Sequence, residues 1–400
     1  MTTWTNWAGN VAATPQRYAA PATIDELRRE VATAADRGWA VRVHGAGHSF
    51  SPVCATDGLL LNLDHLAGIE AIDPVSGEVT VLAGTRIFAM GEPLQAAGRA
   101  LANQGDIDRQ AIAGAIATGT HGTGPAFTSL SGTVRAMEVV TPAGDLLRID
   151  AGDHARLQAA ALAVGMLGVV ARVTLATVPA YRLRQGTFPL PFAEAVARFD
   201  ELTAAHRNVE YWWVPPLDQC VVKTFDASDD APFTLPEEEH PPGTLERYLK
   251  PPKVDWSWRV YPSTRTIPFV ESEYTLPAAA GPAAIAAVRM LMQTRFPDVR
   301  WGVEYRTVAG DDRLLSPTQG APSVTISVHQ VAGEPYEAFM RATEAIFLAH
   351  GGRPHWGKLH WLGRAAIDRL YPAADRFRAL RTDLDPRGIF LNDHLRPLFG

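Results

Sequence analysis

Cysteine is nearly absent from this chain, which has only Cys54 and Cys220 in 400 residues. Two cysteines are too few for a disulfide framework or an iron–sulfur site, and they fit a reducing compartment. We expect neither of them to be catalytic. The first residues also lack a charged segment followed by an apolar one, so no secretory signal is visible. These two absences predict a cytoplasmic protein.

Long hydrophobic runs and an excess of basic residues are missing as well. The longest apolar run, residues 159–171, is interrupted by Arg172 before it reaches the ~18 residues that cross a bilayer. We expect this run to be buried core and predict no membrane span. The formal net charge is −6 and no basic stripe is present, which argues against nucleic acid or an anionic membrane as a partner.

Several common functional fingerprints are also absent. No Gly-x-Gly-x-x-Gly follows a strand and opens a helix, since residues 122–124 run into Pro125. This excludes the usual nicotinamide-binding signature. His355 and His360 lie five residues apart with no third ligand nearby, so we expect no zinc site and no other metal. The lack of a Gly-x-Ser-x-Gly elbow argues against a hydrolase.

The most informative segment is a β-branched strand at residues 41–44 that runs into a glycine-spaced turn. The turn reads Gly45-Ala46-Gly47-His48-Ser49. Its glycines permit positive φ and let backbone N–H groups approach an anion closely. His48 is open to three interpretations, as a nucleophile, a metal ligand or an ordinary turn residue, and the turn alone favours the last.

A second stretch of small residues, 111–124, repeats this pattern with glycines and hydroxyls. One interpretation of this stretch is a loop without a ligand, whose small residues allow it to pack tightly against a sheet. Thr118, Thr120 and His121 within it nevertheless need partners, because each unsatisfied buried polar group costs roughly 1–3 kcal/mol. Phosphate and ribitol oxygens would supply those partners. The two loops together indicate a bound dinucleotide.

The chain is longer than the ~250–300 residues of one ordinary core, so we expect two domains. Thr23 and Glu26 form a capping box for a helix that ends at Gly38. Strands are predicted at residues 40–43, 59–63, 79–82, 134–140, 146–149, 169–175, 209–213, 220–225, 302–308 and 324–328. Further helices are predicted at residues 88–100, 192–205, 283–295, 336–350 and 367–384, with a proline-rich surface loop at residues 236–252.

Three motifs occur here in the order of a known family: the turn at residues 45–49, the loop at residues 117–124, and Arg-Pro-His-Trp-Gly-Lys at residues 353–358. With them the chain resembles the FAD-linked oxidases of the vanillyl-alcohol oxidase type. Among these it is most similar to the sugar-lactone oxidases and to alditol oxidase. The resemblance covers nearly the whole chain and is weakest between about residues 215 and 260.

The resemblance implies an α+β flavoprotein of two domains. Residues 1–178 would form the FAD-binding domain, itself made of two small α/β subdomains. Residues 179–385 would form a mixed cap domain that lies over the flavin and binds the substrate. Residues 386–400 would return to the FAD-binding domain.

FAD is the cofactor that the resemblance implies. In this family the histidine at the position of His48 carries the flavin covalently, through the 8α-methyl carbon. The other cofactor-binding residues implied in this way are His44, Gly45, Ala46, Gly47, Ser49, Ala113, Gly114, Thr118, Gly119, Thr120, His121, Val169 and Asn392.

Glu304 and Arg306 are two residues apart in a predicted strand, so they share one face and Tyr305 lies on the other. An exposed ion pair is the ordinary alternative. The resemblance implies instead that Arg306 binds substrate hydroxyls, Glu304 polarises them, and Lys358 stabilises the negative charge that hydride transfer leaves on the flavin. The substrate-binding residues implied on the same grounds are Asp106, Ser327, His329 and His355.

Gly105 carries a further expectation. In the family a small residue at this point faces the flavin edge that oxygen approaches, and glycine is the oxidase-like choice. An ordinary turn glycine is the alternative reading.

The predicted function is therefore that of an FAD-dependent oxidase of a polyhydroxylated sugar derivative, first of all an aldonolactone such as gulono- or arabinono-1,4-lactone. A C–OH group would give a hydride to flavin N5, and O2 would reoxidise the flavin to yield hydrogen peroxide. The alternatives are an alditol oxidase, a lactone dehydrogenase with another electron acceptor, a flavin-binding protein without turnover, and a hydrolase.

Overall fold

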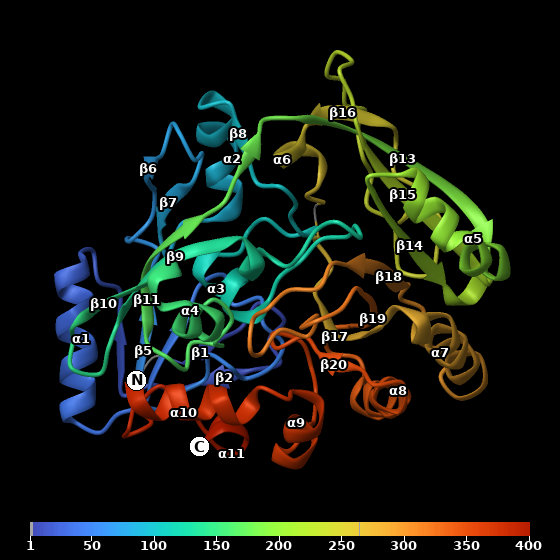
Figure 1. Ribbon diagram of the computed structural model, residues 1–400. Helices are drawn as coiled ribbons and strands as arrows, with labels where there is room; N and C mark the ends of the chain where they lie inside the picture. The colour runs from blue at the N-terminus through green and yellow to red at the C-terminus, as the bar shows by residue number, and fades with distance from the viewer. Residues whose placement is uncertain (1–2, 264) are drawn as a thin grey trace.

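A computed structural model describes residues 3–263 and 265–400 of the chain. Figure 1 shows two halves, with the blue-to-green N-terminal segments and the red C-terminal helices on one side and the yellow-to-orange segments on the other. This is the mixed, two-domain α+β architecture that the sequence predicts. Among the described helices, none is long and apolar enough to cross a membrane.

A small parallel sheet in the N-terminal half holds the glycine turn. Its strands run in the order β3 (Arg17–Ala19), β5 (Leu59–Asn62) and β4 (Val41–His44). Helix α1 (Ile24–Asp36) packs its apolar face into the core beneath β4. Thr23 caps this helix as predicted, because its Oγ1 accepts the Glu26 N–H at 3.1 Å. Strand β4 therefore runs from a rigid support directly into the turn.

The second sheet of this half is antiparallel. Its strands run in the order β10 (Leu146–Asp150), β9 (Val134–Val140), β11 (Val169–Leu175), β7 (Val79–Leu82) and β6 (Ile69–Ile72). Helices α2 (Ile87–Ala96), α3 (Ile112–Thr118) and α4 (His154–Ala160) contribute to the same core. The apolar run at residues 159–171 leads from α4 into β11 and is mostly buried, as expected.

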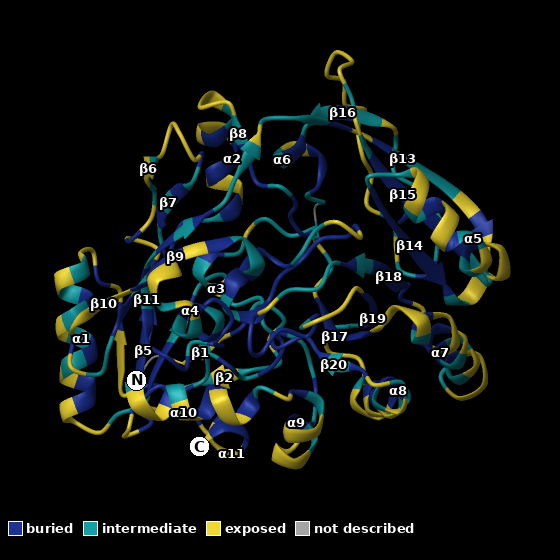
Figure 2. Ribbon diagram, viewed as in Figure 1, coloured by how far each residue is buried: buried dark blue, intermediate teal, exposed yellow. Residues whose placement is uncertain are grey.

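The other half is built on one large antiparallel sheet of eight strands. They run in the order β16 (Lys253–Trp256), β13 (Arg182–Pro191), β15 (Gln219–Ala227), β14 (Asn208–Val214), β18 (Val303–Val308), β19 (Ser323–Val331), β17 (Phe269–Pro277) and β20 (Arg353–Pro354). Helices α5 (Phe192–Ala205), α7 (Gly281–Arg295) and α8 (Glu337–Ala349) cover its outer face (Figure 1). Figure 2 shows the central strands buried and the outer sides of these helices exposed.

Two predicted helices end or break earlier than expected. Helix α2 stops at Ala96, because Gly98 has a φ of +71° and the next residues form strand β8 (Arg99–Ala100). The helix predicted at residues 367–384 is interrupted by Pro372, whose ring and missing N–H are incompatible with a helix interior. The remaining short elements are β1 (Trp4–Thr5), β2 (Ala12–Ala13), β12 (Val178–Pro179), α6 (Ser257–Val260), α9 (Arg364–Leu370), α10 (Ala374–Leu384) and α11 (Arg396–Phe399).

The buried Arg42 ties the glycine-turn region to the C-terminal segment. Its guanidinium donates hydrogen bonds to the carbonyls of Val53 and Val164 at 2.7 Å each and of Phe390 at 2.6 Å. No carboxylate partner is recorded for it among the described residues. Burial therefore lowers the pKa of Arg42 to about 10, and it stays charged at neutral pH.

Candidate active site

Two adjoining cavities lie where the predicted motifs come together. The first cavity has about 1000 Å³ of empty space and is enclosed by β4 and its glycine turn, helix α3 and residues 164–170. Ten of the predicted cofactor residues line it: His44, Gly45, Ala46, Gly47, His48, Ser49, Ala113, Gly114, Thr118 and Val169.

The glycine turn offers the first cavity a row of unused backbone donors. Within residues 3–263 and 265–400, the N–H groups of residues 46–49 have no hydrogen-bond acceptor. Gly47 has a φ of +69°, and a Cβ on Gly45 would lie 2.8 Å from that of Ala111. A Cβ on Gly114, which also lines the cavity, would meet nothing within 4 Å and would point into free space. These features fit a large ligand with an anionic group, as the pyrophosphate of FAD provides.

His48 lines the first cavity with an uncharged ring. The ring stacks on Trp7 with 4.6 Å between centroids, and neither nitrogen has a hydrogen-bond partner among the described residues. Burial, reinforced by the charge of Lys358, lowers the pKa of His48 to about 4. At neutral pH one nitrogen therefore carries a free lone pair, which a nucleophile needs.

The second cavity, with about 630 Å³ of empty space, lies against the inner face of the large sheet. Gln110 lines both cavities, and its buried Oε1 has no partner in the described chain. An orphaned acceptor at this junction fits a ligand that extends from the first cavity to the second. Charged and aromatic side chains form most of the wall: Asp106, His121, Trp212, Arg265, Phe269, Glu271, Glu273, Trp301, Glu304, Arg306, His329, His355 and Lys358.

Strand register brings the polar residues together. Glu273 on β17 is paired with Ser327 on β19, and Ser327 is paired with Glu304 on β18. Glu304 and Arg306 therefore face the cavity, while Tyr305 packs on the other side against Phe199 of α5. The shared face predicted for Glu304 and Arg306 is confirmed. The exposed fractions of Glu304 and Arg306 are 4% and 7%, so the alternative interpretation of these residues as a solvent-exposed ion pair is wrong.

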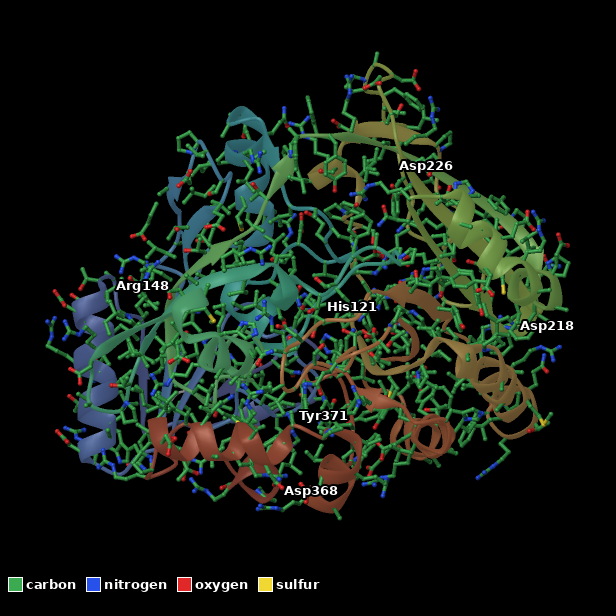
Figure 3. All side chains as sticks on the ribbon, in the orientation of Figure 1. His121, Arg148, Asp218, Asp226, Asp368 and Tyr371 are labelled. Atoms are coloured by element: carbon green, nitrogen blue, oxygen red, sulfur yellow. The ribbon has the colours of Figure 1, made fainter. Side chains whose placement is uncertain are left out.

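Glu273 is the most heavily bonded carboxylate of the site. It accepts hydrogen bonds from His121 Nε2 at 2.7 Å, Arg306 Nη2 at 2.5 Å and Ser327 Oγ at 2.6 Å. Burial alone would raise the pKa of Glu273, but His121 and Arg306 outweigh it and hold that pKa well below its usual range. His121, labelled in Figure 3, sits near the centre of the molecule. Glu273 is therefore a fixed anion.

Glu304 is in the opposite state. Its Oε2 lies 3.2 Å from Arg306 Nη2, while its buried Oε1 has no partner among the described residues. Burial raises the pKa of Glu304 well above its usual range, and repulsion from Glu210 and Asp106 raises it further. The attraction of Arg306 lowers this pKa but does not offset the other two effects. Glu304 is accordingly a neutral carboxyl with a proton to donate.

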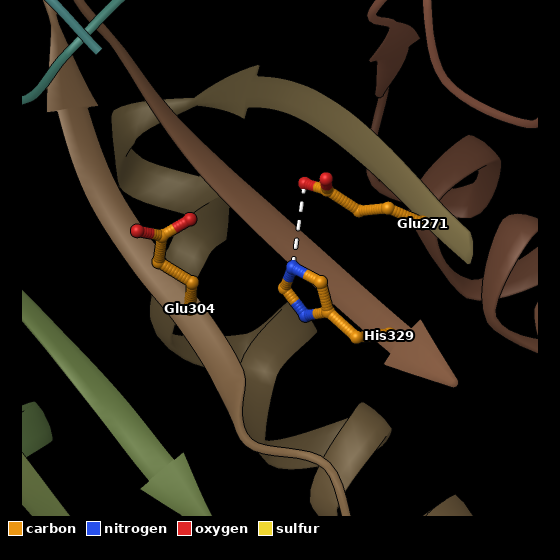
Figure 4. A group of neighbouring side chains, drawn as sticks. All are labelled: Glu271, Glu304 and His329. Carbon is orange, nitrogen blue, oxygen red and sulfur yellow. Dashed lines mark ion pairs between the residues drawn. The ribbon is translucent and has the colours of Figure 1, made fainter. Parts of the chain in front are cut away.

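Glu271 and Lys358 form the second ion pair of the cavity. Lys358 Nζ contacts Glu271 Oε2, and the other carboxylate oxygen lies 3.5 Å from His329 Nε2 (Figure 4). Burial opposes ionisation of Glu271, yet Lys358 and His329 hold its pKa below the usual range. Ligand atoms of Glu271, Glu304 and His329 all lie within 4.8 Å of one another. The negative charges of Glu271 and Glu273, which would attract a metal ion, are already neutralised by Lys358 and Arg306.

Asp106 and Gly105 close the cavity on the side of the N-terminal half. Asp106 lies 3.4 Å from Lys223 and 2.8 Å from Arg265. Although burial opposes ionisation, these two cations lower the pKa of Asp106 to about 2. A Cβ on Gly105 would lie 3.0 Å from the carbonyl oxygen of His121, so any side chain there crowds the cavity wall.

Four predicted cofactor residues lie outside the first cavity. Thr120 and His121 line the second cavity instead. Gly119 ends helix α3 with a φ of +81°. The amide of Asn392 donates to backbone carbonyls in residues 52–55 and holds the C-terminal segment in place. A direct part in cofactor binding stays a prediction for all four.

Several charged or polar residues of the site were not predicted: Gln110, Lys223, Arg265, Glu271 and Glu273. Glu271 and Glu273 on β17 repeat the two-residue spacing of Glu304 and Arg306 on β18, which is separated from β17 by β19. That spacing is a signal the sequence does carry, once β17 is recognised as a strand.

Comparisons with known proteins agree with this arrangement. A family model described as an FAD binding domain matches residues 15–150. A second model, described as D-arabinono-1,4-lactone oxidase, matches residues 173–251 and 243–398. The two models thus correspond to the halves that supply the first cavity and most of the second.

Individual relatives match over nearly their whole length. L-gulono-1,4-lactone dehydrogenase of Mycobacterium tuberculosis is 34% identical over 99% of this chain and 99% of its own. Alditol oxidase of a Streptomyces species is 34% identical over 98% of each chain. The solved structure of cholesterol oxidase from B. sterolicum shares the fold, with a TM-score of 0.84 over 100% of this chain and 96% of that one at 19% identity. The chain therefore belongs to the D-arabinono-1,4-lactone oxidase family and is an FAD-dependent oxidoreductase.

Proposed function

We propose that the protein oxidises one C–OH group of a polyhydroxylated sugar derivative, an aldonolactone in the first instance, with O2 as the electron acceptor. The observation that carries this is that Gln110 lines both cavities, so the cofactor-sized cavity and the charged cavity lie next to each other. One cavity suits FAD, and the other is lined by fixed charges that suit several hydroxyl groups. FAD, when bound, supplies the acceptor for the hydride that leaves the substrate carbon.

The polar side chains of the second cavity divide into donors and acceptors. Arg306 and Lys358 are cations held in place by Glu273 and Glu271, so they donate to substrate oxygens without needing to reorganise. The neutral carboxyl of Glu304 adds a donor whose partner is missing among the described residues. A substrate rich in hydroxyls would satisfy these groups, whereas an apolar one would leave them unpaired.

We further propose a covalent link between FAD and His48. Support comes from the neutral, unbonded imidazole of His48 at the wall of the first cavity. The neighbouring His44 offers a contrast, because its two ring nitrogens are engaged with Tyr18 Oη and the Gly45 carbonyl at 3.0 Å each.

The free cysteines, Cys54 and Cys220, remain consistent with a cytoplasmic location.

Two variants of this function are favoured by particular observations. The Streptomyces relative is named for alditols, so linear polyols are the second candidate substrate class. The M. tuberculosis relative is named a dehydrogenase, so transfer of the electrons to an acceptor other than O2 is the second variant. Gly105 on the wall of the second cavity favours access of O2, because it leaves that part of the wall without a side chain.

A substrate screen tests the proposal. The purified holoenzyme would be offered sugar lactones, alditols and the matching free aldoses, and hydrogen peroxide would be measured with a coupled peroxidase. We expect the fastest turnover with an aldonolactone. Peroxide from alditols alone would move the assignment to the second class. Turnover with an artificial electron acceptor but no peroxide would make the protein a dehydrogenase.

A further inference from the structure

The second cavity contains three histidines, and their hydrogen bonds show which of the ring nitrogens are already engaged. His121, His329 and His355 all line its wall. A neutral imidazole has one N–H donor and one lone pair, and the partner of one nitrogen fixes the role of the other. A nitrogen next to a carbonyl must carry the hydrogen, whereas one that receives an N–H must carry the lone pair.

His121 has no free ring nitrogen to offer. Its Nδ1 lies 2.8 Å from the Gly122 carbonyl and its Nε2 lies 2.7 Å from Glu273 Oε1. Both neighbours only accept hydrogen bonds, since Glu273 is ionised. Both nitrogens of His121 are therefore engaged with these two acceptors, and neither is free to accept a proton from a substrate.

His355 presents a donor to the cavity. The backbone N–H of Gly357 donates to His355 Nδ1 at 3.1 Å, so Nδ1 holds the lone pair and Nε2 holds the hydrogen. Burial lowers the pKa of His355 to about 3, which keeps the ring neutral. Its lone pair is already used by the backbone.

His329 is the reverse of His355. Burial lowers the pKa of His329 and keeps its ring neutral at pH 7, so the ring carries a single hydrogen. Its Nδ1 lies 3.1 Å from the Gly302 carbonyl and holds that hydrogen, which leaves the lone pair on Nε2. Its Nε2 lies 3.5 Å from Glu271 Oε1 (Figure 4). Glu271 is ionised and has no hydrogen to give. The lone pair of His329 therefore faces the cavity without a donor.

The carboxylates of the cavity are poor proton acceptors by comparison. Glu304 is already protonated, because its pKa is raised by burial. The pKa values of Asp106, Glu271 and Glu273 are held below the ordinary range by neighbouring cations. A carboxylate with a low pKa gains little by taking a proton from an alcohol. His329 is the one titratable group of the described cavity that is both unprotonated and free to accept.

We propose that Nε2 of His329 accepts the proton of the substrate hydroxyl, an assignment that rests on the oxidation proposed above. The O–H bond breaks and its electron pair becomes the second bond of the new carbonyl group. The hydrogen on the same carbon leaves as a hydride, with two electrons, for the FAD. The proton remains on His329, where Glu271 Oε1 faces the resulting imidazolium.

The surroundings of His329 set its response to pH. Glu271 on β17, Glu304 on β18 and Lys358 are the titratable or charged groups that face it, and the rings of Trp212, Phe269 and Trp301 fill the rest. Burial lowers the pKa of His329 below the ordinary 6.5, Glu271 raises it and Lys358 lowers it. The base is therefore active at neutral pH and is lost as the pH falls through that lowered pKa.

Anaerobic reduction of the bound flavin as a function of pH tests the kinetic part. Wild-type reduction should slow as the pH falls through the lowered pKa of His329. His329→Asn keeps an N–H for the Gly302 carbonyl but has no basic nitrogen. In this variant the flavin should be reduced on the order of 10²-fold more slowly. The decrease of the reduction rate at low pH, which we call the acid limb, should also disappear. In the matched control, His355→Asn, the acid limb should remain at the same pH. An unchanged limb in His329→Asn would overturn the proposal.

Nitrogen-15 NMR of histidine-labelled holoenzyme gives a readout that needs no turnover. The signals of His329, identified by their loss in His329→Asn, should show hydrogen on Nδ1 and a free Nε2. Hydrogen on Nε2 instead would contradict the assignment even in a fully active enzyme. If neither lactones nor polyols reduce the flavin, the proposed function fails, and the NMR result alone decides on His329.

Discussion

At the scale of single residues, the site contains glutamate side chains whose surroundings give them different protonation states. Glu273 meets three donors and stays ionised, while Glu304, two strands away, has one oxygen without a partner and keeps its proton. Fixed donors and acceptors of this kind suit a substrate whose hydroxyl groups must be told apart. Changing one residue should therefore alter one step of the reaction rather than all of them.

The free imidazole of His48 leads to a prediction about flavin attachment. Acid-denatured wild-type protein should retain flavin fluorescence on the polypeptide, and His48→Ala should release it. His44→Gln serves as the control, because His44 lies in the same cavity with both nitrogens engaged. Flavin that washes off the denatured wild-type protein entirely would rule out the covalent link but not FAD binding.

The bare wall at Gly105 leads to a prediction about oxygen. A Cβ there would already touch the His121 carbonyl at 3.0 Å, and the branched side chain of valine would fill part of the second cavity. Gly105→Val should slow reoxidation by O2 more than anaerobic reduction by substrate, and Gly105→Ala should do so to a smaller extent. Stopped-flow measurement of the two half-reactions separates these effects. Equal slowing of both would indicate a general distortion of the cavity.

Lys358 should act mainly on the rate of hydride transfer. It is a cation fixed by Glu271 at the wall of the second cavity, so Lys358→Met removes a preorganised positive charge and leaves Glu271 uncompensated. We expect flavin reduction to slow by a factor on the order of 10²–10³, with a smaller loss of substrate binding. Arg341→Met, which removes an exposed cation on α8, should leave both unchanged. Near-normal reduction in Lys358→Met would remove this residue from the active site.

At the scale of elements, strand β17 shows where sequence reasoning ends. Its Glu271 and Glu273 are almost fully buried, so the strand lacks the alternation of apolar and exposed polar residues by which strands are recognised. Their burial is stabilised by Lys358, His121 and Arg306, which are 33 to 152 residues distant in sequence. No local pattern can report partners of that kind.

Other elements follow from local signals. The capping box of α1 and the alternation around Tyr305 depend on residues within a few positions of each other, and both are predicted correctly. The positions of Glu304, Arg306, His329, His355 and Lys358 around one cavity came from the family resemblance, since spacing alone could not unite three distant segments. Pro372 and Gly98 ended helices that apolar periodicity had extended too far.

Arg42 leads to a prediction about how the elements are held together. Arg42→Met would leave at least three buried carbonyls without a donor, so the free energy of unfolding should fall by at least about 3 kcal/mol. The control is Arg17→Met, an exposed arginine on β3 that pairs with Glu30 and should cost no more than about 1 kcal/mol. Urea unfolding of the two holoenzymes compares them. Equal stability would mean that the C-terminal segment is held by other contacts.

At the scale of the whole molecule, the two halves place two different binding chemistries side by side. The N-terminal half offers unpaired backbone N–H groups and small residues, and the large sheet of the other half offers buried charged side chains. Gln110 lines both cavities.

The most direct test of the account is the absorbance spectrum of the purified holoenzyme under anaerobic conditions, before and after addition of an aldonolactone. The account predicts an oxidised-flavin spectrum that bleaches on addition of the lactone and returns with air, with one hydrogen peroxide formed per flavin. A protein without a flavin spectrum, or a bound flavin that stays oxidised with every lactone and polyol tried, would contradict it.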